Sequence, residues 1–197
     1  MIYNFIAYTP SQAPAHHGNY PWLGDDARKA INLGWTYNQY MKMLPNDDDW
    51  ACFLDHDAMF TTNNWYQQLE AVIEKHPEYG LFTAMTNRIG HSIQRVRGID
   101  PSNHDMKYSR KLGLELQEKY YDQVTEMPRV IAGVLMLTKK SVWKATDGFK
   151  NGFLGIDSNY DGQVRKLAGY KVGLMDGVFV YHWYREKLNE DKPALKS

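Results

Sequence analysis

Short apolar runs alternate along the chain with segments whose apolar residues recur at helical spacing. The runs are too short for ordinary helices and predict strands that are largely buried. Strands are expected at residues 2–9, 50–54, 80–85, 130–137, 170–175 and 178–182. Helices are expected at residues 25–33, 35–44, 65–76, 109–122, 139–146 and 157–168.

This alternation is typical of an α/β domain in which helices flank a central, mostly parallel sheet. We expect one domain over residues 1–185, followed by a charged and loosely held tail over residues 186–197. Asp176-Gly177 is a turn pair and predicts a hairpin between the last two strands. Gly34 is expected to separate the first two helices, and Thr138 to cap the helix that follows it.

The charge balance limits the classes of partner. Lysine plus arginine equals aspartate plus glutamate, at 23 each, so no net field attracts nucleic acid or an anionic membrane. No apolar run approaches the length of a bilayer span, and the first residues lack the basic start of a signal peptide. The single cysteine, Cys52, fits a reducing compartment. These features predict a cytoplasmic protein without a transmembrane segment, and they leave the oligomeric state open.

Two carboxylates follow the apolar run at residues 50–54. Because side chains alternate in extended chain, Asp55 and Asp57 point the same way and His56 points the other way. Such a pair is costly near a core unless a hard cation or a hydrogen-bond donor lies between the carboxylates. Ligands of open α/β sheets bind outside the carboxyl ends of the strands, where this pair falls. A bare Asp-x-Asp is also compatible with a solvated loop.

Three groups of residues, taken in order, resemble the GT-A glycosyltransferases, and within them the family 2 type that uses nucleotide-diphosphate sugars. The first group, Asn-Leu-Gly-Trp-Thr-Tyr-Asn at 32–38, is similar to the family's Gly-x-x-x-x-Asn helix that runs into its Asp-x-Asp. The second covers residues 132–149, from Ala-Gly-Val-Leu-Met-Leu to Asp-Gly-Phe. The third combines Gly-Ile-Asp at 155–157 with Ala-Gly-Tyr at 168–170 and Tyr-His at 181–182. The resemblance implies a single GT-A (Rossmann-like) domain.

The resemblance also implies a metal site. Asp57 would be a direct ligand of Mn²⁺ or Mg²⁺, His182 a second ligand, and Asp55 would contact the ribose or reach the metal through water. Carboxylate oxygens suit both ions, and Mn²⁺ also accepts an imidazole. Without the resemblance, His182 would be interpreted as an ordinary histidine at a strand end.

The same resemblance assigns contacts with the sugar donor, for which UDP is the first expectation. Residues 7–9 would hold the base and ribose, and Arg185 and Lys187 would close over the diphosphate. The implied donor-binding positions are Ala7, Tyr8, Thr9, Asn38, Asp55, His56, Arg185 and Lys187. The acceptor, which the sequence does not identify among a glycan, a lipid-linked sugar and a small molecule, would be bound by the loop at 89–108.

The chain departs from the family at two places. The family's general base aligns with Ser158, which cannot accept the proton of an acceptor hydroxyl, so we assign this role to Asp157 and hold Asp161 in reserve. Either acid is also favourable simply as a charge in the first turn of a helix. In addition, about forty residues separate Thr9 from Trp50, which leaves little room for the second βα unit that family members usually carry.

Two other functions compete with this interpretation. A phosphatase of the haloacid dehalogenase type also places Asp-x-Asp after an apolar strand, with the first Asp as nucleophile. That motif normally follows the first strand, and the lysine and second acidic pair of such enzymes are not evident here. A non-catalytic protein that binds a nucleotide sugar on a shortened GT-A scaffold is the other alternative, because Ser158 stands where a base is expected.

Overall fold

The computed structural model describes residues 1–7 and 32–183, and it contains a seven-stranded sheet flanked by helices. The helix expected at 25–33 and the tail at 186–197 lie outside the described residues, except for the end of that helix. The strands are β1 (Ile2–Ala7), β2 (Trp50–Asp55), β3 (Ala58–Phe60), β4 (Tyr79–Thr86), β5 (Val124–Glu126), β6 (Leu135–Lys139) and β7 (Lys171–His182). The helices are α1 (Leu33–Met43), α2 (Trp65–Lys75), α3 (Met106–Tyr120), α4 (Lys140–Lys144) and α5 (Ile156–Lys166), with a short 3₁₀ turn η3 (Ser92–Gln94).

The sheet is mixed, with the order β1-β2-β6-β4-β7-β3 and with β5 on β7. β1 with β2 and β4 with β7 pair in parallel. The other four pairings, β2–β6, β4–β6, β3–β7 and β5–β7, are antiparallel. The α/β class is therefore confirmed, but the expectation of a mostly parallel sheet is wrong. β6 inserts between β2 and β4 and runs against both, and an apolar run carries no signal of its direction.

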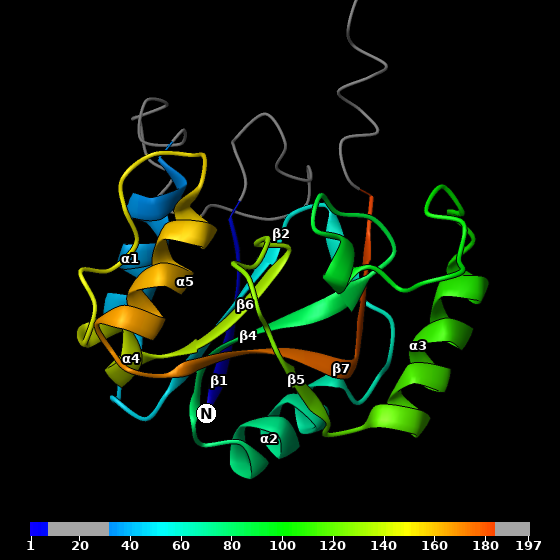
Figure 1. Ribbon diagram of the computed structural model, residues 1–197, viewed down its shortest axis with the longest axis horizontal. Coiled ribbons are helices and arrows are strands. Elements are labelled where there is room, and N and C mark those ends of the chain that lie inside the picture. Colours follow the sequence, from blue (N-terminus) through cyan, green and yellow to red (C-terminus); the bar gives the residue numbers. More distant parts are fainter. Residues whose placement is uncertain (8–31, 184–197) are drawn as a thin grey trace, which may run out of the picture.

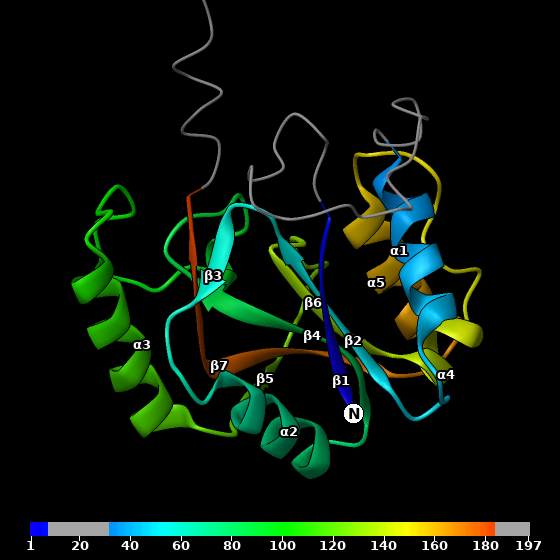
Figure 2. The same cartoon turned by 180° about the vertical axis from the view of Figure 1, so that it is seen from behind.

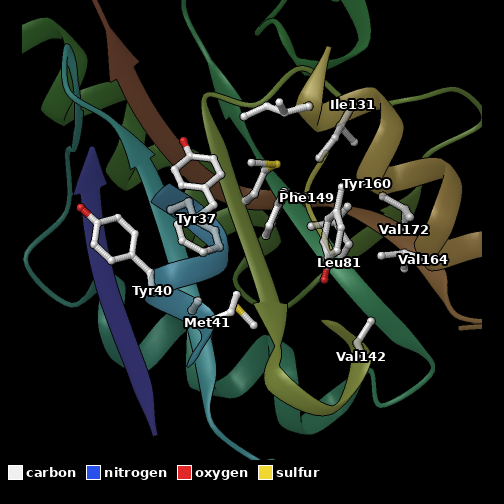
Figure 3. Close-up of a cluster of buried hydrophobic side chains, with 14 of the residues drawn as sticks. Tyr37, Tyr40, Met41, Leu81, Ile131, Val142, Phe149, Tyr160, Val164 and Val172 are labelled. Atoms are coloured by element: carbon white, nitrogen blue, oxygen red, sulfur yellow. The ribbon is translucent and has the colours of Figure 1, made fainter. Parts of the chain in front are cut away.

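Helices cover both faces of the sheet (Figure 1). α1, α4 and α5 lie together on one face, and α2 packs on the other. Figure 3 shows Tyr160 and Val164 of α5 beside Leu81 of β4, and Tyr37 and Met41 of α1 belong to the same buried cluster. These side chains are all at most 2% exposed, so this face forms a continuous apolar core.

β2 contributes to both cores because its side chains alternate between the faces. Ala51 and Phe53 join the cluster under α1 and α5, while Trp50, Cys52 and Leu54 join the cluster under α2. All five are buried, as the sequence predicted for this strand. β2 therefore lies inside the molecule, and its carboxyl end brings Asp55 to the edge of the sheet.

β7 is one long bent strand, so the hairpin expected at Asp176-Gly177 is wrong. Its pairing with β4 steps from Met175 opposite Ala84 to Phe179 opposite Met85, and the intervening residues bulge out of the ladder. A Cβ on Gly177 would lie 2.6 Å from the carbonyl oxygen of Tyr120 at the end of α3. The turn pair therefore makes a bend and a close approach to α3, which is visible where β7 turns in Figure 1.

Three smaller expectations also fail. Gly34 lies inside α1 rather than between two helices. The absence of a Cβ at this position lets the helix approach the backbone of Lys150 closely. Thr138 stays in β6, where its hydroxyl contacts Tyr160 Oη at 2.9 Å and donates to Gly80 O at 2.8 Å. Residues 130–134 precede β6 as irregular chain rather than strand.

Among the described helices, none combines the length and the apolar character that crossing a bilayer requires.

Candidate metal centre

The short strand β3 brings the acidic turn to the end of β7. It pairs antiparallel with β7 so that Ala58 lies opposite His182, and the amide of Trp183 donates to the carbonyl oxygen of Asp57 at 2.9 Å. Figure 2 shows β3 beside the end of β7. On the other side of the turn, the amide of Asp55 donates to Val134 O at 3.1 Å. The turn at 55–57 is therefore held at both ends.

Asp55, Asp57 and His182 face one another. Nε2 of His182 lies 3.2 Å from Oδ1 of Asp57 and 3.7 Å from Oδ2 of Asp55. One potential ligand atom from each residue lies within 4.8 Å of the others. The side chain of His182 is 4% exposed, whereas those of Asp55 and Asp57 are 34% and 25% exposed. The imidazole ring of the group is therefore buried, and its two carboxylates are partly exposed to solvent.

The tautomer of His182 follows from its second ring nitrogen. Nδ1 lies 2.9 Å from the carbonyl oxygen of Arg88, and a carbonyl can only accept, so Nδ1 carries a proton. In the neutral ring, Nε2 therefore presents a lone pair to the two carboxylates. Three negative or lone-pair donors facing one another require a cation or a further proton between them. Metal-bound histidines show the same arrangement, with the other ring nitrogen donating to a carbonyl or carboxylate.

The two carboxylates differ in their electrostatics. Burial raises the pKa of Asp55 to about 7; the charge of His182 opposes this rise, and those of Asp57 and Asp157 add to it. Burial also acts to raise the pKa of Asp57, but the hydrogen bond and charge of His182, with a contribution from His56, bring it below its ordinary value. A nearby cation would favour the ionised form of both groups. Two oxygen donors and one imidazole fit a hard or borderline divalent ion such as Mg²⁺ or Mn²⁺.

Asp157 lies in the first turn of α5, near Asp55. Its Oδ2 accepts from the amide of Gly133 at 2.9 Å, and its Oδ1 accepts from the amide of Ser158 at 2.8 Å. Its charge raises the pKa of Asp55 and that of the buried Tyr37, after the larger effects of burial. The side chain of Asp157 also packs closely on Gly133, where a Cβ would lie 3.1 Å from that of Asp157.

Asp161, the reserve candidate for the base, has a structural role. It is fully buried, its Oδ2 accepts from the amide of Ile131 at 3.0 Å, and its Oδ1 accepts from Arg165 at 2.5 Å. Both oxygens are thus engaged inside the protein, in holding the chain before β6 against α5. Proton transfer to Asp161 from a substrate would require this buried ion pair to break.

The remaining site residues expected from the sequence are dispersed. Ala7 lies opposite Asp55 in the parallel ladder, at the same sheet edge. His56 is exposed in the turn between the carboxylates. The side chain of Asn38 makes hydrogen bonds within the fold: its Oδ1 accepts from Trp143 and Phe149, and its Nδ2 donates to Phe149 O. The other expected positions lie outside the described residues: Tyr8, Thr9, Arg185 and Lys187.

Two residues just beyond β4 were missed as parts of the site. The chain just beyond β4 lies at the same sheet edge as the carboxylates. The roles of Asn87, which bonds the backbone of His182, and of the Arg88 carbonyl were not anticipated. A polar residue directly after an apolar strand was the available signal, but the partner of such a residue cannot be read from local sequence.

No protein-family model matches the chain, and no curated protein matches it with significant similarity. The chemical interpretation of the Asp55, Asp57 and His182 group therefore rests on the residues themselves and their geometry.

Proposed function

We propose that the protein is a metal-dependent glycosyltransferase of the GT-A type, which transfers a sugar from a nucleotide-diphosphate donor, with UDP as the first expectation, to an acceptor hydroxyl. The observation that supports it best is the set of contacts around His182. Its Nδ1 is committed to a carbonyl, and its Nε2 faces Asp57 and Asp55 at 3.2 and 3.7 Å. A histidine held in this way beside two carboxylates at a sheet edge supports the proposal of a cation site.

In this proposal, Asp57 and His182 would hold a Mn²⁺ or Mg²⁺ ion, with Asp55 as a further ligand. When bound, such an ion neutralises the diphosphate and stabilises the charge that develops on the leaving oxygen. The two carboxylates are partly exposed, so oxygens of the donor could reach an ion held there. The buried side of His182 keeps the ring fixed while the donor enters and leaves.

Asp157 is the proposed general base. As the acceptor oxygen forms its bond to the anomeric carbon, the bond from that carbon to the diphosphate breaks, and Asp157 takes the acceptor proton. The amides of Gly133 and Ser158 orient its carboxylate and leave each oxygen with a further lone pair. Attack from the face opposite the leaving group gives an inverted product.

A nucleotide-sugar-binding protein without transferase activity is the second candidate. Ser158 favours it, because the hydroxyl at the position of the family's base donates to the carbonyl of Gly155 at 3.3 Å and offers no base. Both candidates use the metal site, and they differ in whether Asp157 acts as a general base. The phosphatase alternative differs from both, because it needs Asp55 as a nucleophile.

The deciding experiment combines binding with turnover. Melting temperatures are measured with UDP-, GDP- and TDP-sugars, with and without Mn²⁺, because a ligand that binds only the folded state raises the melting temperature. The donor that stabilises most is then incubated with a panel of sugar acceptors, and both nucleotide release and glycoside formation are followed. Metal-dependent product formation supports the transferase, and metal-dependent binding without product under any acceptor supports the binding protein. Absence of any metal-dependent stabilisation, or hydrolysis of simple phosphate monoesters, would contradict both.

A further inference from the structure

Where the pairing of β4 with β7 ends, the side chain of Asn87 makes the backbone hydrogen bonds that a neighbouring strand would otherwise make. The last ladder pair is Thr86 opposite Val180. Beyond it, Oδ1 of Asn87 accepts from the amide of His182 at 2.7 Å, and Nδ2 donates to the carbonyl of His182 at 3.1 Å. One buried amide, 4% exposed, thus satisfies both backbone groups of the same residue.

The next residue holds the ring of His182. The carbonyl of Arg88 accepts from Nδ1 at 2.9 Å, so two consecutive residues fix the backbone, the orientation and the tautomer of this histidine. From the opposite side, β3 pairs Ala58 with His182. His182 is therefore clamped between β3 and the chain at 87–88, with Nε2 directed at the carboxylates.

We propose that Asn87 is a positioning residue for the metal centre: it sets the place and direction of His182 Nε2 without touching the ion. This inference rests on the proposed metal site. If the two bonds from Asn87 are lost, the end of β7 can move away from residues 87–88, and the bond between Nδ1 and Arg88 O loses its geometry. Partners that orient a metal-bound histidine typically change metal affinity by about 10- to 100-fold when they are removed.

The test compares Asn87→Ala with wild type by titrating Mn²⁺ alone and following free Mn²⁺ by electron paramagnetic resonance. We expect binding about 10- to 100-fold weaker in Asn87→Ala. Gln117→Ala is the matched control, because it also removes a buried side-chain amide, one that donates to Gln68 at 2.8 Å far from the metal centre. It should lower the melting temperature and leave the Mn²⁺ affinity unchanged. A loss of affinity below about fivefold in Asn87→Ala, or an equal loss in Gln117→Ala, would overturn the proposal.

A second readout does not depend on metal. Long-range ¹H–¹⁵N spectra of the metal-free protein, with the His182 signals assigned by their loss in His182→Gln, should show a proton on Nδ1 in wild type. Asn87→Ala should lose this single state, and an unchanged ring spectrum would contradict the inference. If wild type binds no Mn²⁺, the proposed function fails while this spectrum still tests the positioning. If Asn87→Ala does not fold, Asn87→Asp, which keeps the acceptor for the His182 amide and sets an oxygen against its carbonyl, is measured by the same criteria.

Discussion

Nε2 of His182 lies 3.2 Å from Oδ1 of Asp57, although more than half of the chain separates the two residues. Two carboxylates and a ring nitrogen meet at one sheet edge because β3 turns back along the outer side of β7. Burial raises the pKa of Asp55 to about 7, and a metal ligand must be deprotonated, so an ion in the proposed site would displace that proton. The arrangement therefore links metal binding to the protonation of this site.

Removal of the imidazole should abolish metal-dependent stabilisation. In His182→Ala the ion loses its buried ligand, so the rise in melting temperature that Mn²⁺ gives wild type should disappear. That rise corresponds to about 2.7 kcal/mol at an ion concentration 100 times the dissociation constant. His76→Gln is the control, since Nε2 of His76 contacts Asp122 O at the end of α2, away from the sheet edge. A full Mn²⁺ response in His182→Ala would contradict the ligand assignment.

The raised pKa of Asp55 predicts how metal-free stability depends on pH. Burial raises its pKa to about 7 from an ordinary value of 3.8, so between these values the folded state binds more protons than the unfolded state. Stability should therefore fall as the pH rises from about 4 to about 7 and stay flat above that, as far as Asp55 is concerned.

Asp55→Asn should remove this loss. Each pKa unit corresponds to about 1.4 kcal/mol, and because the Asp55 side chain is 34% exposed, we expect the variant to be more stable than wild type by about 1 to 2 kcal/mol at pH 8. The difference should vanish below pH about 4, where the wild-type carboxyl is protonated in both states. Urea denaturation with chelator across this pH range measures it. A difference that is the same at both ends of the range would show that Asp55 is not the titrating group.

The strands β1, β2 and β4 follow from the sequence, because they are apolar runs closed by polar residues, whereas β3, which brings the carboxylates to His182, was not predicted. The contact of Asp57 with His182 was expected only from the resemblance, since no local pattern in either segment specifies the other. The direction of β6 was not predictable, because burial on both faces makes parallel and antiparallel strands equally apolar.

Other features depend on tertiary contacts that short-range signals do not contain. Asp176-Gly177 has the chemistry of a hairpin turn, but the close approach of Gly177 to the Tyr120 carbonyl uses the same freedom for a bend in β7. Asn87 is one of many polar residues after a strand, and its function lies in two bonds to a residue far along the chain. The residues that position the site were therefore harder to predict than the carboxylates themselves.

The two acids of α5 should respond differently to neutralisation. Asp157→Asn should lower the transfer rate by about 10²- to 10⁴-fold, as for loss of a general base, with Mn²⁺ and donor affinities retained. Asp161→Asn should instead destabilise the fold by about 1 to 3 kcal/mol, because it weakens the buried hydrogen bonds to the Ile131 amide and to Arg165, whose side chain is 29% exposed. Steady-state kinetics and urea denaturation of both variants separate the effects. If Asp157→Asn keeps full activity while folded Asp161→Asn loses it, the assignment of the base is wrong.

Two glycines on helices provide a matched test of how α1 supports the loop before Asp157. Gly34 donates its amide to Gly152 O at 3.1 Å, and a Cβ there would lie 1.9 Å from the backbone oxygen of Lys150. Gly34→Ala should therefore cost about 1 to 3 kcal/mol, because backbone atoms must move to accept the methyl group. A Cβ on Gly162 in α5 meets nothing within 4 Å, so Gly162→Ala should stabilise the protein by about 0.5 to 1 kcal/mol through helix propensity. The free energies of unfolding from urea titrations should thus shift in opposite directions. A neutral or stabilising Gly34→Ala would mean that α1 does not press on the 150–152 loop.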